Sequence, residues 1–229
     1  PQFRTPVELN AVDPQRLVIV GSNSIYESLN QGNTISEVDD GGTSFGSPLD
    51  QSAVAYGHPA NTDVIWAGQS GVVRVRTSAG GSLNTTSTAF PGGGTVRDLV
   101  LDTTTATANS AFVIDSNQVY STTDTGASWN DITGNLAALG ALDFYSMAFL
   151  PLAGVNAVLV GTQTGVFYSV STAYNVWTKL GTGLPNVLTF DLDYDVADDV
   201  LIAGTMGRGV WRLSAASAEI LPLDFGDAP

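Results

Sequence analysis

A fivefold internal repeat is the feature of this sequence that most restricts its fold. One apolar or aromatic column is formed by Tyr26, Val73, Tyr120, Phe167 and Trp211, which are spaced by 47, 47, 47 and 44 residues. Five copies of about 46 residues account for nearly all of the 229 residues. A period of this length predicts a repeated supersecondary unit whose copies bury their faces against one another.

Each copy has the residue pattern of short β-strands joined by turns. Runs rich in Val, Ile, Phe, Tyr and Trp are separated by Gly, Asp, Asn and Pro. The middle run of most copies is almost continuously apolar, as expected for a strand covered on both faces. Three to four strands in each repeat predict an all-β chain of the β-propeller class, with one blade per repeat. The expected repeats are 7–48, 49–93, 94–140, 141–185 and 186–223, followed by a linker or further module at 224–229.

The sequence leaves the closure of the propeller open. Five blades either close on themselves or form part of a larger ring, and the outermost strand of the last blade comes either from 1–7 or from 214–223. Only one short helix is expected, at 135–141. No apolar run approaches the roughly 18 residues that a spanning helix needs, so no membrane insertion is expected.

The charge of the chain excludes several classes of partner and chemistry. Eight basic and 22 acidic residues give a net charge of −14, and such a chain repels phosphate backbones, so nucleic acid is not an expected partner. The absence of Cys excludes a disulfide framework, a thiolate metal site and a cysteine nucleophile. His58 is the single histidine and precedes a proline, which indicates a turn residue rather than a metal ligand.

A turn of defined chemistry follows the third predicted strand of several copies. Its fullest version is the octet 122–129, in which Asp124 bonds back onto the turn and Gly126 supplies a positive φ. Trp129 then offers a large surface to bury. The key residues are Thr122, Asp124, Gly126, Ser128 and Trp129, and the first copy keeps Ser28, Asn30, Gly32 and Thr34.

This octet resembles the Asp-box, or BNR repeat, of the propellers found in sialidases, sortilin-type receptors and xyloglucanases. The resemblance implies a secreted or cell-surface bacterial protein, in which the turn is a folding device away from the axial cleft. The segment 223–229 is similar to the start of a GEVED-type module. Phe3-Arg4-Thr5-Pro6 resembles the sialidase motif that carries a substrate-binding arginine, but the other sialidase residues have no counterpart here.

Candidate site residues are few and scattered. Asp191 and Asp193 alternate on one predicted strand and are the candidate carboxylates if the chain is a glycoside hydrolase. Tyr145, Tyr174 and Tyr194 are the candidate ligand-binding aromatics, and the pair Asp39 and Asp40 is the candidate cation site. No cofactor is expected.

The sequence therefore favours a non-catalytic binding or scaffolding propeller module, extracellular or on the cell surface, with a glycan or a protein as its ligand. Two alternatives stay open. One is a fragment of a xyloglucanase-like or sialidase-like glycoside hydrolase that acts through axial carboxylates. The other is a structural subunit of a surface assembly, in contact with other domains or chains.

Overall fold

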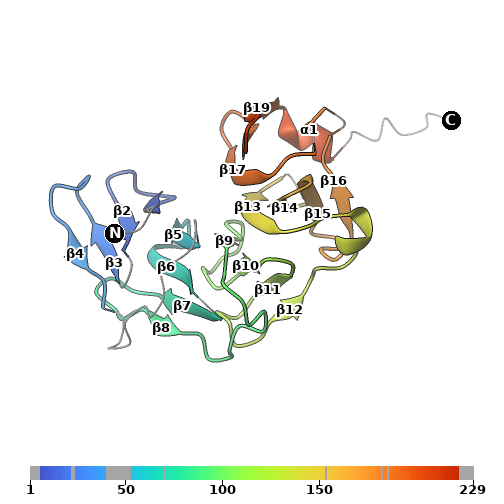
Figure 1. Cartoon of the computed structure of the whole chain (residues 1–229). Helices are drawn as coiled ribbons and strands as arrows, with labels where there is room; N and C mark the ends of the chain where they lie inside the picture. The colour runs from blue at the N-terminus through green and yellow to red at the C-terminus, as the bar shows by residue number, and fades with distance from the viewer. Residues whose placement is uncertain are drawn as a thin grey trace. The chain divides into compact units, whose positions relative to one another are not determined.

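The computed structural model describes residues 6–21, 24–39, 53–69, 71–152, 154–181, 183–184 and 186–221. The chain divides into two compact units, residues 1–133 and 134–229. Their described residues form five antiparallel sheets and very little helix (Figure 1). Each sheet takes all its strands from one of the five predicted repeats.

The first unit contains three four-stranded sheets. In each, the strands lie side by side in chain order, and each strand pairs antiparallel with the next. The first sheet is β1 (Val7–Leu9), β2 (Leu17–Val20), β3 (Ile25–Ser28) and β4 (Ser36–Glu37). The second is β5 (Val54–His58), β6 (Asn61–Gln69), β7 (Val72–Arg76) and β8 (Asn84–Thr85), and the third is β9 (Asp98–Leu101), β10 (Ala111–Ile114), β11 (Val119–Thr122) and β12 (Asn130–Asp131).

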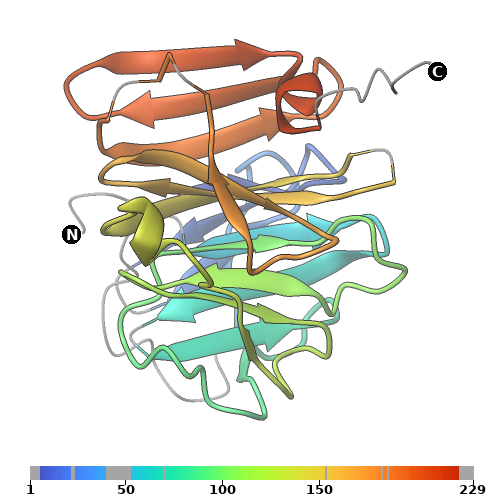
Figure 2. The same ribbon diagram turned by 90° about the vertical axis from the view of Figure 1, so that its right-hand side faces the viewer.

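The second unit contains a four-stranded sheet and a three-stranded sheet. The fourth sheet is β13 (Phe144–Leu150), β14 (Ala157–Thr162), β15 (Gly165–Val170) and β16 (Trp177–Lys179), preceded by the 3₁₀ turn η1 (Ala137–Leu139). The fifth is β17 (Thr189–Asp195), β18 (Val200–Thr205) and β19 (Gly209–Ser214), followed by α1 (Ala216–Ile220), which lies at one end of this sheet in Figure 2. These sheets confirm the predicted all-β propeller class with five blades.

Successive sheets within a unit bury apolar faces against each other. We call the face that packs on the next sheet along the chain the forward face, and the opposite one the backward face. The forward face of the first sheet places Val18, Val20 and Ile25 on the second sheet. Likewise, Trp66 and its neighbours on the second sheet pack on the third, and Leu159 and its neighbours on the fourth pack on the fifth.

The strand register corrects one member of the predicted aromatic column. Tyr26, Tyr120, Phe167 and Trp211 each pair with the middle strand at an equivalent position, but in the second sheet that position is Arg74, not Val73. Tyr120 and Phe167 are buried, as expected of a blade core, whereas Tyr26 and Trp211 are exposed. The column is therefore buried in the third and fourth sheets and exposed in the first and last.

Of the two suggested sources of an outermost strand for the last sheet, the segment 214–223 needs correction. The segment 214–223 does not supply it, because Ala216–Ile220 is a helix. Val7 belongs to the first sheet, where it pairs with Ile19, and residues 1–5 lie outside the described part. Among the described residues, β19 is consequently the edge strand of a three-stranded sheet.

Candidate functional site

Among the residues that the structure describes, the ion pairs gather between the first and second sheets. Glu27 on β3 faces Arg76 on β7, and two hydrogen bonds of 2.7 and 2.8 Å join the guanidinium to both carboxylate oxygens. Arg16 donates to Glu27 at 3.1 Å and to Asp63 at 2.8 Å. Tyr56 on β5 donates its hydroxyl proton to Glu27 and accepts a hydrogen bond of 2.7 Å from Arg16 Nε. We call these five residues the charge cluster.

The charge cluster is largely withdrawn from water. Arg76 is only 2 % exposed and the side chain of Glu27 13 %. Burial raises the pKa of Glu27, but hydrogen bonds from Arg76, Tyr56 and Arg16 outweigh it and lower that pKa to about 2. Burial together with the adjacent carboxylate raises the pKa of Tyr56 to about 12. Near neutral pH, Glu27 is therefore a carboxylate and Tyr56 a neutral phenol.

This protonation pattern does not suit acid–base or nucleophilic chemistry. A general acid or base works best with a pKa near the operating pH, and both of these groups are shifted away from it. Their hydrogen-bonding groups are also used within the cluster, which links two sheets. Sequence reasoning missed the cluster, although the alternation of Arg74 and Arg76 with valines on one strand was a usable signal.

The predicted turn at 122–129 has the expected hydrogen bonds. Thr122 Oγ1 accepts from the amide of Gly126 at 2.9 Å, and Asp124 accepts from the amide and hydroxyl of Ser128 at 2.8 and 2.6 Å. These bonds lower the pKa of Asp124 below its ordinary value. Trp129 packs edge-on against Phe90, with ring centroids 5.5 Å apart, and donates Nε1–H to the carbonyl of Thr88 at 3.2 Å.

The eroded copy in the first sheet keeps the same geometry. Ser28 Oγ accepts from the amide of Gly32 at 2.8 Å, and Asn30 accepts from the amide of Thr34, also at 2.8 Å. Gly32 has φ +84°, close to the +74° of Gly126. An amide oxygen at position 30 thus replaces the carboxylate without changing the turn.

His58 and Asn10 connect the turns of neighbouring sheets. Asn10 donates to the carbonyl of Thr62 at 2.7 Å. His58 is fully buried at the end of β5, where Nδ1 accepts from the amide of Ala60 at 3.0 Å and Nε2 lies 2.9 Å from the carbonyl oxygen of Asp102. These partners assign the imidazole proton to Nε2. The histidine is therefore both a turn residue, as predicted, and a link to the third sheet.

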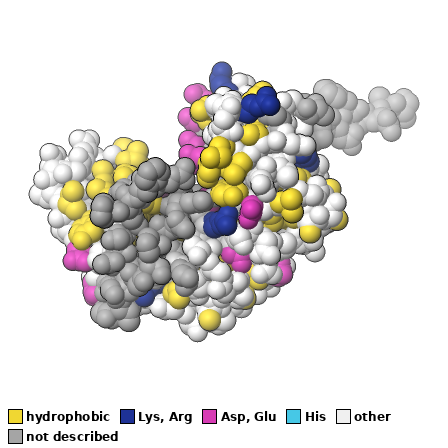
Figure 3. Space-filling model, viewed as in Figure 1, with side chains coloured by type: hydrophobic (Ala, Val, Ile, Leu, Met, Phe, Trp, Pro, Cys, Tyr) yellow, Lys and Arg dark blue, Asp and Glu magenta, His cyan; other side chains and the backbone are white. Residues whose placement is uncertain are grey.

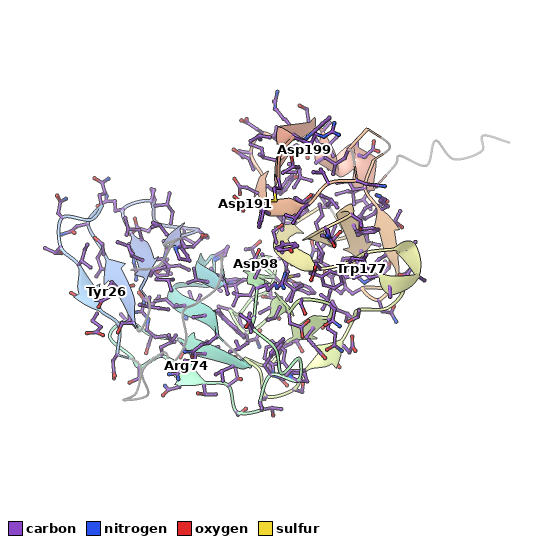
Figure 4. The ribbon with its side chains drawn as sticks, in the orientation of Figure 1. Tyr26, Arg74, Asp98, Trp177, Asp191 and Asp199 are labelled. Carbon is purple, nitrogen blue, oxygen red and sulfur yellow. The ribbon has the colours of Figure 1, made fainter. Side chains whose placement is uncertain are left out.

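Asp191 and Asp193 lie on the forward face of the fifth sheet, together with Asp195. Asp191 is labelled in Figure 4. All three are exposed, and the predicted common face is confirmed. Asp195 accepts from the amides of Ala197 and Asp198, as a turn aspartate does. Asp191 and Asp193 stand two residues apart on one side of one strand, about 7 Å along it.

The three candidate tyrosines have different surroundings. Tyr145 packs edge-on against Phe190, with ring centroids 5.2 Å apart. Tyr174 is partly buried in the connection from β15 to β16. Tyr194 packs on the core of the second unit, and its hydroxyl donates to Asp199 at 2.9 Å. The structure does not bring these three residues together with Asp191 and Asp193 on one strand face.

Of the remaining candidate residues, only Asp39 lies in the described part of the chain. The carboxylate of Asp39 accepts from the hydroxyl of Ser82, and its carbonyl accepts from the amide of Leu83. Asp40 and Arg4 lie outside the described residues. Within the described part of the chain, no group of three or more His, Cys, Asp or Glu side chains is placed to hold a metal ion.

Comparisons with known proteins extend the fold assignment. No family model and no curated protein sequence matches the chain. A GH74 xyloglucanase from Xanthomonas campestris is similar in structure, with a TM-score of 0.67 and 15 % identity over 91 % of this chain and 36 % of the enzyme. YCF48 from Cyanidioschyzon merolae gives 0.61 and 15 % over 91 % of this chain and 66 % of that one.

A third similar structure is the extracellular domain of a hybrid two-component system from B. thetaiotaomicron. It gives a TM-score of 0.60 and 12 % identity over 93 % of this chain and 28 % of that one. The chain thus spans about a third of the xyloglucanase. At these identities the likeness defines the fold, which is a β-propeller. In the described residues, no helix has the length and apolarity to cross a bilayer.

We predict that Gly126→Ala destabilises the protein more than Gly80→Ala does. Both glycines have a positive φ, +74° and +65°, so alanine is strained at either position by about 1 kcal/mol. At 126 the new methyl group would also lie 2.4 Å from Thr86 Cγ2, whereas nothing lies within 4 Å at position 80. In urea unfolding, the free energy of unfolding of Gly126→Ala should be lower than that of Gly80→Ala by about 1–2 kcal/mol. Equal losses would contradict this account of the turn.

We predict that Glu27→Gln lowers the free energy of unfolding by about 3 kcal/mol, because it leaves the buried Arg76 without its counter-charge. The control is Glu219→Gln on the exposed side of α1, which should change stability by less than about 0.5 kcal/mol. Urea unfolding at pH 7 measures the free energy of unfolding of both variants and of the parent. A loss for Glu27→Gln no larger than that of the control would show that the cluster contributes little.

The lowered pKa of Glu27 predicts how the stability of the protein depends on pH. A carboxyl whose pKa falls from 4.5 to about 2 on folding stabilises the protein fully above pH 4.5, and this contribution is lost as the pH falls through 2. After allowance for partial exposure, it amounts to about 2 kcal/mol. Unfolding measured from pH 6 to pH 2 should show the parent and Glu27→Gln converging by this amount. A constant gap would contradict the assignment.

Proposed function

We propose that this chain is a non-catalytic binding or scaffolding propeller module of a secreted or cell-surface protein, with a glycan or a protein as its ligand. The charge cluster is the observation that supports this most. Its two carboxylates, phenol and two guanidinium groups are the kinds of group that a glycosidase would use. Here they are committed to each other, and they hold two sheets together.

The position of the candidate carboxylates also favours binding over hydrolysis. An acid and a base must flank a glycosidic bond, which requires them to approach it from different sides. Asp191 and Asp193 project from one side of one strand, so they present a row rather than a pair of opposed groups. A row of carboxylates on a sheet face suits a contact surface.

The turns are consistent with a secreted propeller. The geometry at 122–129 and its copy at 28–35 fit the Asp-box resemblance, in which the turn is a folding device. One structural neighbour is described as an extracellular domain and another as a xyloglucanase. Both descriptions belong to those proteins. They support an extracellular, glycan-related role for this chain as part of the proposal.

A second candidate function is that of a glycoside hydrolase fragment, favoured by the structural likeness to the xyloglucanase. The two functions predict different outcomes in one experiment. The full chain is incubated with xyloglucan and with a panel of other plant and bacterial polysaccharides. Affinity electrophoresis measures retention on each polysaccharide, and a reducing-end assay measures cleavage.

We expect retention on at least one polysaccharide, or saturable binding on a protein array, with no release of reducing ends. Asp191→Asn/Asp193→Asn, which keeps the shape of both side chains, should behave as the parent in the cleavage assay. Release of reducing ends that is abolished in this variant would overturn the proposal in favour of the hydrolase. Cleavage that persists in the variant would overturn it too, but would place the catalytic groups elsewhere.

A further inference from the structure

The fifth sheet has one strand fewer than the other four sheets. In each of those, the third strand pairs on its outer side with a short fourth strand, β4, β8, β12 or β16. In the fifth sheet, β19 pairs with β18 along all six of its residues, and no described strand lies on its other side. An edge of this kind presents unpaired amide and carbonyl groups, to which an extended segment can add as a further strand.

The four fourth strands show the chemistry of an outer segment in this repeat. In each, a polar residue is followed by the residue that pairs with the aromatic column, and then by a residue that is only 5 to 8 % exposed. The amide of this last residue donates to a carbonyl of the third strand at 2.8 to 3.0 Å. The four segments are Ser36-Glu37-Val38, Asn84-Thr85-Thr86, Asn130-Asp131-Ile132 and Thr178-Lys179-Leu180.

β19 has the positions that accept such a segment. By its register, Trp211 belongs to the aromatic column, and Val210 corresponds to the residue whose carbonyl accepts the amide in the other sheets. In the fourth sheet these positions are Phe167 and Val166, which are fully buried, whereas Trp211 is 39 % and Val210 71 % exposed. Lys179 of β16 extends over the Phe167 ring, with Nζ 5.6 Å from the ring centroid. A segment added beside β19 would cover Trp211 in the same way.

Two exposed arginines set the charge that an added segment should carry. Arg208 lies in the turn before β19, Arg212 lies on β19, and β19 itself has no acidic residue. Neither arginine forms an ion pair with another described residue. On its sheet face, Arg212 is separated from Asp193 by Ile202 on the strand between them. Basic side chains are visible over the fifth sheet in Figure 3. A carboxylate on the added segment would therefore be attracted to this edge.

We propose that β19 binds an extended segment of a partner protein as its fourth strand, with the pattern polar, acidic, apolar that Asn130-Asp131-Ile132 has in the third sheet. A second copy is disfavoured as the occupant, because pairing of two β19 strands would bring Arg208 and Arg212 of both chains together. This inference rests on the proposed binding function and gives it a protein ligand and a site. Hydrolysis in the polysaccharide experiment would contradict that function without testing this edge, so the two failures are distinguishable.

The test combines the full chain with a synthetic peptide that has the chain's own sequence at 128–133, Ser-Trp-Asn-Asp-Ile-Thr, with both ends blocked and a fluorescent label. Fluorescence anisotropy measures binding, and hydrogen exchange measures protection of the backbone amides. We expect saturable binding that slows exchange in β19 by about tenfold or more. Exchange in β12 is the control, and it should not change, because the peptide adds to β19 and does not replace the chain's own copy.

Two changes in the peptide and one in the protein separate strand pairing from charge. Methylation of the Ile132 amide nitrogen keeps every side chain but removes the donor, and should weaken binding about tenfold or more. The peptide change Asp131→Arg should weaken binding to the parent chain. The protein variant Arg208→Glu/Arg212→Glu should reverse this preference and bind the Asp131→Arg peptide better than the original one. The peptide changes leave the protein intact, so they test the proposal even where the protein variant does not fold.

Four results would overturn the proposal. The first is the absence of saturable binding up to a peptide concentration of about 1 mM, the weak end of specific recognition. The second is an unchanged affinity for the methylated peptide, since strand pairing would then play no part. The third is slow exchange of the β19 amides in the free chain, which would mean an edge already paired within the chain or, if it rises with concentration, with a second copy. The fourth is an affinity that none of the charge changes alters.

Discussion

The contact of one apolar sheet face with the next is the interaction on which the rest of this structure depends. No blade of four short strands can bury both of its faces alone, so each repeat is stable only with a neighbour. In the first unit, Val18 and Val20 cover Tyr56 and Ile65, and Trp66 covers Leu99 and Val113. The turn at 122–129 and the charge cluster link residues around these contacts.

The repeat allowed most of the fold to be predicted, because hydrophobic period and turn chemistry are local properties of a sequence. The all-β class, the five sheets and the hydrogen bonding at 122–129 all follow from residues close together in the chain. The predictions that were wrong concern residues whose surroundings depend on packing between distant parts of the chain. Tyr26 and Trp211 match the buried aromatics of the column but are exposed, and the helix at Ala216–Ile220 lies in one of the two segments suggested for an outermost strand.

The alternation of Arg74 and Arg76 with valines was a signal for buried arginines, but their partners in the charge cluster could not be predicted, because they come from different strands of two sheets. Glu27 and Arg76 are 49 residues apart, and only the packing of two sheets brings them within hydrogen-bonding distance. The placement of Arg74, in the column where Val73 was expected, depends on a one-residue register that sequence spacing does not resolve. Candidate positions on single strands, such as Asp191 and Asp193, were predictable, whereas the partners of any residue across a sheet interface were not.

The turn at 122–129 also ties the third repeat to the second. It holds the segment after the second sheet through Thr88, whose amide and hydroxyl donate to the carbonyls of Gly126 and Ala127, and whose carbonyl accepts from Trp129. The outer edge of one repeat is thus closed by residues of the next. Local opening of the third repeat would release part of the second, so the cooperative unit of this protein is larger than the sequence repeat.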